Sequence, residues 1–211
     1  MGYQIIATPA FAGAGLPSLI TPGFGDDFNR PDSLELGATS RGGRAWNLLP
    51  SAAGADIVPQ VKGQQLASAG STGYVLGYAE AHAADVLVEA TIAYAARDTA
   101  LTPNLRLAAR CSSAAPAAFA TVRWSNMAGA EYLWLDTYGT RLTVQSGVLG
   151  DLTGRRIGLK AQGDVFTVYI DGVQIIAPTT APGLAGITRH GFQANNSSNA
   201  ARLDDIAVTP L

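Results

Sequence analysis

Two pairs of adjacent aspartates stand near the two ends of the chain, and paired carboxylates can bind a hard cation. Asp26 and Asp27 open the segment DDFNRPDSLELG, and Asp204 and Asp205 lie in the segment ARLDDIAV. Calcium takes several oxygen ligands, which carboxylates and loop carbonyls together can provide. Aspartates in turns also accept hydrogen bonds from backbone amides. The four aspartates are therefore a candidate calcium site, and the capping of turns is the alternative interpretation.

A second carboxylate pair would be needed for the hydrolysis of glycosidic bonds. Retaining glycosidases hold an acid and a nucleophile about 5–5.5 Å apart. The candidates in the segment EYLWLD are Glu131 and Asp136, which are five residues apart with no acidic residue between them. A regular strand places such residues on opposite faces. We therefore predict no catalytic residue, and we expect that the protein is not an enzyme.

Histidine and cysteine are too few for the common metal and nucleophile sites. The chain has two histidines, His82 and His190, and a single cysteine, Cys111. These residues cannot build a three-histidine zinc site, a cysteine zinc site or a disulfide within the chain. We interpret each histidine as a surface or strand-edge residue and Cys111 as a small core residue. The sequence also contains no nucleophile elbow and no phosphate-binding loop.

Four aromatic residues lie close together in the middle of the chain, at Trp124, Tyr132, Trp134 and Tyr138. Tyr132 and Trp134 share one face of the same expected strand. Aromatic rings on an exposed sheet face can stack on sugars, which have apolar C–H faces and polar rims. Aromatic side chains also commonly fill the core, so glycan binding and core packing both stay open for this group.

Composition excludes several classes of partner. Charged residues make up 14% of the 211 residues, below the roughly 25% of typical soluble domains, and the net charge is −2. No cluster of lysine and arginine appears, so we expect no nucleic-acid partner. The apolar start of the chain is broken by Pro9, Pro17 and Pro22, so we expect no membrane span.

Residues 1–24 and 25–211 differ in character. The first segment is apolar, without periodicity and punctuated by proline and glycine, which predicts an extended N-terminal arm. An apolar arm must cover its surface on its own domain or on a neighbouring subunit. The residues predicted to dock are Tyr3, Ile5, Ile6, Phe11, Leu16, Leu19 and Ile20.

The body of the chain follows the period of β-strands. Residues 85–93 alternate between apolar and polar side chains, as in a half-buried strand. The alanine-rich segment 78–98 could also form a helix, but its β-branched residues favour a strand. Residues 156–177 predict a three-stranded meander with turns at Gly163-Asp164 and Asp171-Gly172.

Further strands are expected at residues 104–110, 119–124, 132–137, 141–146, 191–196 and 203–208. Strands recur about every ten residues with turn residues between them, which is typical of an all-β sandwich or barrel.

The segments DDFNRPDSLELG…W, FTVYIDGV and GFQANNSSNAARLDDIAV resemble the concanavalin A-like lectin and glucanase superfamily, also called laminin-G-like, over about residues 25–209. This resemblance implies an antiparallel two-sheet jelly-roll sandwich in which the first and last strands are neighbours. Phe28 and Ile206 would then point into the core from adjacent strands. Some members carry calcium near this sheet edge, and the glucanase branch carries a Glu-x-Asp-x-(x)-Glu pattern that this chain lacks.

The resemblance also implies a role, because members that begin with this motif after a short arm are frequent among tail and virion proteins of bacteriophages. We therefore expect a virion structural protein, a minor tail or capsid decoration component, that assembles with copies of itself and other virion proteins through its arm. The alternative is a carbohydrate-binding module that recognises glycans of the host cell surface. A glycan-cleaving enzyme is the third and disfavoured interpretation.

Overall fold

A computed structural model of the protein describes residues 23–51, 56–70, 73–94, 105–113, 118–127, 130–138, 143–195 and 201–211. The arm residues that we predicted to dock lie outside these ranges. The described elements are all strands, and no helix in the described part of the chain is long and apolar enough to cross a membrane.

The first four described strands have three or four residues each, and most of the later strands are longer. In chain order they are β1 (Phe24–Asp26), β2 (Asn47–Pro50), β3 (Val58–Val61), β4 (Leu66–Ala69), β5 (Tyr74–Glu80), β6 (Val86–Tyr94), β7 (Leu105–Ala109), β8 (Phe119–Met127), β9 (Ala130–Tyr138), β10 (Thr143–Gln145), β11 (Arg156–Gln162), β12 (Val165–Ile170), β13 (Val173–Thr180), β14 (Arg189–Asn195) and β15 (Arg202–Pro210).

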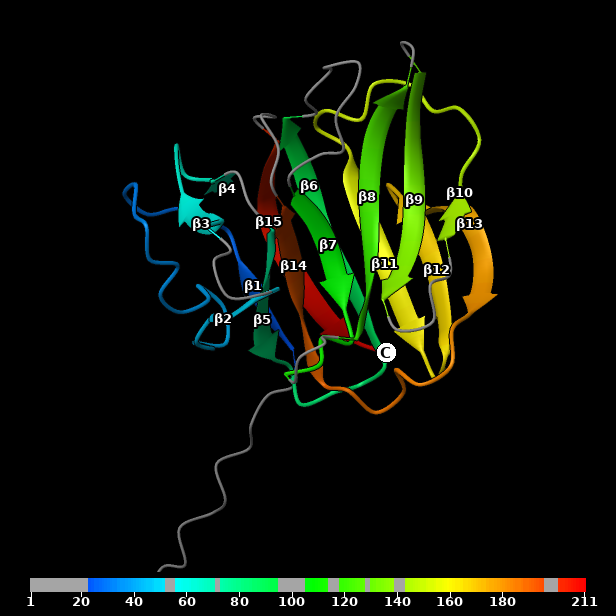
Figure 1. The fold of residues 1–211 in the computed structure, drawn as a ribbon, viewed down its shortest axis with the longest axis horizontal. Helices are drawn as coiled ribbons and strands as arrows, with labels where there is room; N and C mark the ends of the chain where they lie inside the picture. The colour runs from blue at the N-terminus through cyan, green and yellow to red at the C-terminus, as the bar shows by residue number, and fades with distance from the viewer. Residues whose placement is uncertain are drawn as a thin grey trace, which may run out of the picture.

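These strands form two antiparallel sheets. The eight-stranded sheet has the order β13-β12-β11-β6-β15-β4-β3, with β1 also paired to β15. The seven-stranded sheet has the order β10-β9-β8-β7-β14-β5-β2. In the view of Figure 1, β8 and β9 of this sheet lie in front of β11 of the other sheet. The predicted two-sheet sandwich is confirmed.

The first and last strands of the body are neighbours, as the resemblance implies. In the antiparallel pair of β1 and β15, Asp26 lies opposite Ile206. Phe28 and Ile206 are both fully buried. Phe28 lies two residues beyond the end of β1 and adopts a left-handed backbone conformation with a φ of 50°. The two aspartate pairs therefore meet in space because their strands pair.

Strand periodicity predicted the strands in the middle of the chain. Of the alanine-rich segment, residues 78–80 end β5 and residues 86–94 form β6, so the alternative of a helix is wrong there; Val86, Val88 and Ile92 face the core from one side of β6. The predicted meander is β11, β12 and β13. Its last turn has positive φ angles at Asp171 (47°) and Gly172 (77°), as a type I′ hairpin requires.

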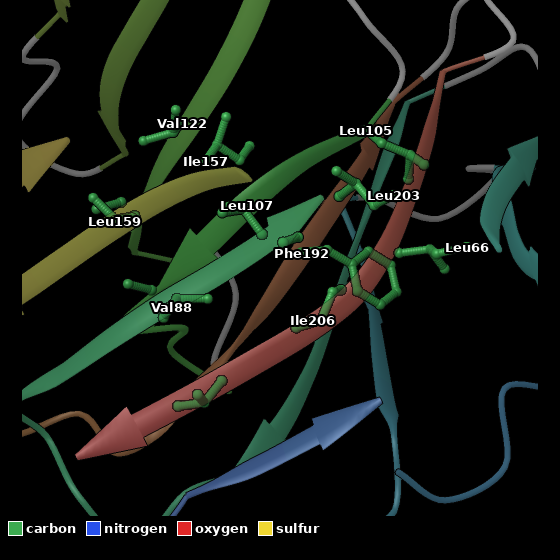
Figure 2. Packing of buried hydrophobic residues seen from close by; sticks show 14 of the residues in the cluster. Leu66, Val88, Leu105, Leu107, Val122, Ile157, Leu159, Phe192, Leu203 and Ile206 are labelled. Atoms are coloured by element: carbon green, nitrogen blue, oxygen red, sulfur yellow. The ribbon is translucent and has the colours of Figure 1, made fainter. Parts of the chain in front are cut away.

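The core fills the space between the two sheets. Figure 2 shows Leu107, Val122 and Phe192 of the seven-stranded sheet meeting side chains of the other sheet. Those opposing side chains come from β6, β11, β15 and β4, and the labelled ones are Val88, Ile157, Leu159, Leu203, Ile206 and Leu66. Each of these side chains is fully buried, so the hydrophobic effect holds the two sheets against each other.

Our interpretation of His190 as a surface or strand-edge residue is wrong, because its side chain is completely buried. Its Nδ1 accepts a hydrogen bond from the backbone N–H of Arg110 at 3.2 Å. Its Nε2 lies 3.0 Å from the carbonyl oxygen of Ala83 and therefore carries the proton and donates it. His82, in contrast, is exposed as expected.

Burial makes His190 sensitive to acid. Loss of hydration lowers the pKa of His190 from its ordinary value of 6.5 to about 4, and the nearby charge of Arg110 acts in the same direction. The unfolded chain therefore binds this proton before the folded chain does. We expect the free energy of unfolding to fall by up to about 3 kcal/mol as the pH drops from about 6.5 to about 4.

Chemical denaturation across this pH range, for the wild type and for His190→Gln, measures this effect. The glutamine keeps a donor for the Ala83 carbonyl but has no proton to gain, so the slope between pH 6.5 and pH 4 should become shallower. An unchanged slope would mean that His190 does not titrate in this range.

Candidate functional site

The carboxylate of Asp26 is fully buried and bound on both oxygens by the protein itself. Oδ1 accepts hydrogen bonds from the backbone N–H of Phe28 (3.0 Å) and from Nη1 of Arg30 (2.8 Å). Oδ2 accepts from Nη2 of Arg30 (2.9 Å) and from Nε1 of Trp46 (2.7 Å). Our prediction of Asp26 as a calcium ligand is therefore wrong, because four donors occupy its oxygens.

This network explains the opening motif. Arg30 also donates to the carbonyl oxygen of Leu36 at 2.7 Å, so its guanidinium connects Asp26 to the backbone at Leu36. The Trp46 ring packs against Phe24, Phe28 and Phe192, with ring centres 5.6, 6.4 and 5.3 Å away. The aspartate, the arginine four residues later and the distant tryptophan are one structural unit of the core.

The other three aspartates lie around one open, polar hollow of about 340 Å³. Asp205 is paired with Arg41 (2.7 Å) and Arg156 (3.0 Å), so its charge is already balanced. Burial raises the pKa of Asp204, whereas the backbone N–H of Asn29 lowers the pKa of Asp27. Within the described residues, no three His, Cys, Asp or Glu side chains are grouped so as to hold a metal ion. Calcium binding by Asp27, Asp204 and Asp205 stays a prediction.

A second group of polar and aromatic side chains lies on the outer face of the seven-stranded sheet, the face turned away from the core. The strand registers align one row across it, with Gln193 beside Arg106, and Arg123 beside Trp134. The pairing of Leu107 with Val122 places Arg106 next to Arg123 in the same row. We call this surface the outer face of the sheet.

Arg123, Trp134 and Asp136 form the centre of the outer face. Nε of Arg123 donates to Oδ2 of Asp136 at 2.6 Å, and the guanidinium carbon lies 4.5 Å from the centre of the Trp134 ring. Thr143 donates its hydroxyl proton to Oδ1 of Asp136 at 3.0 Å. The arginine is therefore fixed by a charged partner on one side and by an aromatic ring on the other.

Arg106 lies beside this centre and is almost completely buried. Its Nη1 donates to the hydroxyl of Tyr138 at 2.8 Å and lies 3.8 Å from Oδ2 of Asp136. In the amide orientation that satisfies both groups, the Asn195 oxygen accepts from Nη2 (2.6 Å) and Nε (2.9 Å) of Arg106. The face is therefore built from a connected polar network rather than from separate surface side chains.

Aromatic side chains border this network. Phe119 and Tyr138 stack with ring centres 4.3 Å apart, and Tyr74 lies 6.0 and 6.1 Å from these two rings. Phe119 and Cys111 are buried here in a small apolar cluster separate from the main core. Cys111 is thus buried as predicted, and burial raises the pKa of its thiol.

The structure brings three of the four predicted glycan-binding residues to one face. Tyr132, Trp134 and Tyr138 alternate along β9 with fully buried residues and are themselves partly exposed. The prediction for Trp124 is wrong, because its side chain is only 2% exposed and belongs to the main core. Trp124 neighbours Arg123 in the chain and therefore points to the opposite side of the sheet.

Sequence reasoning did not find Arg106, Arg123, Tyr74 and Asn195 as members of this face. A signal was present for Arg106, because it is the charged residue between Leu105 and Leu107, which are fully buried. Strand alternation then places the arginine on the other side of the sheet. The partners of Arg106 come from β9 and β14, which no local pattern identifies.

The carboxylates of β9 do not form a catalytic pair. Glu131 is buried and its Oε2 accepts a hydrogen bond from the backbone N–H of Leu152 at 2.8 Å. Asp136 points to the outer face, so the prediction that the two lie on opposite faces is confirmed. Glu80 on β5 is four strands away from Asp136, which is roughly 19 Å at about 4.8 Å per strand.

No protein-family model matches the sequence, and no curated protein matches it. Solved structures share the fold. A non-specific endo-β-1,3(4)-glucanase of family GH16, SCLam, is similar with a TM-score of 0.55 and 11% identity, over 90% of this chain and 95% of the other. A pseudo β-1,3-glucanase of Mycobacterium tuberculosis is similar with a TM-score of 0.52 and 12% identity, over 90% and 99% of the two chains.

A carbohydrate-binding module from Bacillus subtilis, CBM66, gives a TM-score of 0.46 at 13% identity, over 78% of this chain and 94% of the other. At these identities the similarities concern the fold alone. The chain has the concanavalin A-like jelly-roll fold of the GH16 glucanases. None of the three named structures is described as a phage protein, so the virion role and assembly through the arm stay predictions.

Proposed function

We propose that the protein is a carbohydrate-binding module that holds a glycan on the outer face of the seven-stranded sheet and does not cleave it. The observation that carries this proposal is the combination of Trp134 and Tyr138 with Arg106, Arg123 and Asp136 on one side of one sheet. Sugars need apolar surfaces for their C–H faces and fixed polar groups for their hydroxyls, and this face offers both.

The preorganisation of the polar groups supports binding. Arg106 is held by Tyr138 and Asn195, and Arg123 is held by Asp136. Side chains that are already ordered lose little conformational entropy when a ligand arrives. A ligand can therefore use their hydrogen-bonding and ring surfaces without ordering them first.

The shared fold also supports this proposal. The similar structures include an endo-β-1,3(4)-glucanase and a pseudo β-1,3-glucanase, so the same sandwich fold occurs in proteins that are named for β-glucans. The proposal stops short of catalysis because Asp136 has no second carboxylate beside it among the described residues.

Replacement of Trp134 by alanine is expected to weaken glycan binding by at least about tenfold, which corresponds to about 1.4 kcal/mol. The reason is the loss of a stacking surface and of the ring that positions Arg123. A glycan array identifies the ligand, and isothermal titration then compares the wild type with the variant.

Tyr169 provides the matched control, because it is a partly exposed aromatic residue on β12 in the other sheet. Tyr169→Ala should leave the affinity unchanged. Equal losses in the two variants, or binding unaffected by Trp134→Ala, would place the site elsewhere. No binding to any neutral or charged glycan would refute the proposed function.

A further inference from the structure

We infer that the glycan held on the outer face is anionic and carries a carboxylate or sulfate group that Arg123 binds. This inference rests on the proposed function and adds the chemical class of the ligand. Two observations carry it: the excess of positive charge at the centre of the outer face, and the terminal nitrogens of Arg123, which make no hydrogen bond to the described residues.

The centre of the outer face carries more positive than negative charge. Arg106 and Arg123 both lie near Asp136, with Nη1 of Arg106 at 3.8 Å and Nε of Arg123 at 2.6 Å from the same carboxylate oxygen. Two guanidinium groups therefore share one carboxylate. Glu80, another carboxylate on this sheet, lies four strands away from Asp136. Among the described residues, one positive charge at the centre therefore has no carboxylate partner of its own.

Burial strengthens the electrostatic effect of this excess positive charge, because water screens it poorly. The side chains of Arg106, Arg123 and Asp136 are 9%, 18% and 13% exposed, so water screens them poorly. Loss of hydration lowers the pKa of Arg106, and repulsion from Arg123 adds to this effect. In a site of low effective dielectric constant, an incoming anion is attracted more strongly than it would be at a fully hydrated surface.

The guanidinium of Arg123 is oriented to bind an anion. Only its Nε is used by Asp136, and its two terminal nitrogens make no hydrogen bond to the described part of the chain. The guanidinium lies against the Trp134 ring, which fixes its plane. Two parallel N–H groups on a planar arginine match the two oxygens of a carboxylate or a sulfate. Trp134 and Tyr138 beside it would contact the sugar ring that carries the anion.

The decisive experiment measures binding of three probes by isothermal titration at low and high salt. The probes are an oligogalacturonate with carboxylates, a chondroitin sulfate oligosaccharide with sulfates as well, and the neutral β-glucan laminarin. We expect at least tenfold tighter binding of an anionic probe than of laminarin, and weaker anion binding at 0.3 M than at 0.05 M salt. Because both anionic probes carry carboxylates, binding of chondroitin sulfate alone indicates that the sulfate is bound, and binding of oligogalacturonate shows that a carboxylate is sufficient.

Charge variants separate recognition from a structural role. Arg123→Gln should weaken binding of the anionic probe at least tenfold. Asp136→Asn should strengthen it about threefold or more, because the asparagine oxygen can still accept from Arg123 while the competing negative charge is gone. A purely structural pair would move both variants in the same direction. Lys160→Gln on β11 of the other sheet removes the same charge and should have no effect.

Each other outcome counts against the inference. Tighter binding of laminarin, together with insensitivity to the charge variants, would overturn it and leave the proposed function standing. An equal loss in Lys160→Gln and Arg123→Gln would reveal unspecific attraction and would also overturn it. Failure of all three probes and of a wider glycan array would refute the proposed function itself. Thermal unfolding of each variant confirms that it is folded before its binding is compared.

Discussion

Replacing Asp26 with asparagine lowers the free energy of unfolding by about 3–5 kcal/mol, the usual effect of breaking a buried ion pair. Each carboxylate oxygen accepts two hydrogen bonds, Oδ1 from the Phe28 amide and Arg30 and Oδ2 from Arg30 and Trp46. An asparagine side chain must place its NH₂ group at one of these two positions. Either orientation sets donors against donors and leaves Arg30 without its counter-charge. Urea denaturation at pH 7 measures the difference.

Asp27 is the matched control for this substitution, because it is the adjacent residue and is exposed. Its carboxylate accepts a hydrogen bond from the Asn29 amide at 3.2 Å, which an asparagine oxygen can also accept. Asp27→Asn should therefore change the stability by no more than about 0.5 kcal/mol. Similar effects at the two positions would show that the buried network around Asp26 does not stabilise the start of the body.

Replacing Asp85 with alanine is the second substitution with a large expected effect, about 2–3 kcal/mol, because Arg110 is fully buried although Asp85 itself is half exposed to solvent. Asp85 Oδ1 accepts from Nη2 of Arg110 at 2.8 Å and from the Gly163 amide at 3.0 Å. The Arg110 side chain is fully buried and also donates to the Leu184 carbonyl at 3.0 Å. Without Asp85, a buried cation loses the carboxylate that contacts it, and burial already lowers the pKa of Arg110.

The same reasoning predicts a rescue. Adding Arg110→Met to Asp85→Ala removes the uncompensated charge and fills most of its space with an apolar side chain. The double variant should therefore be more stable than Asp85→Ala by about 1 kcal/mol or more, although it carries one more substitution. A double variant that is less stable than Asp85→Ala would mean that Arg110 stabilises the fold mainly through packing and its bond to the Leu184 carbonyl.

Local patterns were sufficient to predict the strands from β6 onward and the turns of the last meander, whereas β2, β3 and β4 were not predicted. The alternation of residues 85–93 and the Asp171-Gly172 turn needed no distant partner to be read correctly. The separation of Glu131 from Asp136 also followed from the two-residue period of a strand. These features depend on neighbours within a few residues, so the sequence alone contains their physical cause.

Predictions that depended on partners from distant strands were correct only in part. The aspartate pairs meet as expected. The carboxylate oxygens of Asp26, however, accept hydrogen bonds from Arg30 and Trp46, so this residue cannot bind a metal ion. His190 is buried beside two segments that are distant in the chain, the end of β7 and the connection between β5 and β6, and these supply Arg110 and Ala83 as its hydrogen-bonding partners. A lone histidine in a short polar segment carries no local sign of such surroundings.

The sequence by itself determined that Tyr132 and Trp134 share one side of a strand, because the side-chain direction alternates with every residue, and the structure extends this strand to Tyr138. Only the tertiary structure decided that this side faces away from the core and that Trp124 lies on the other side. Only the register of β7, β8, β9 and β14 brought Arg106, Arg123 and Asp136 together. Register and the stacking of two sheets arise from contacts between distant segments, and the local period of a single strand does not encode them.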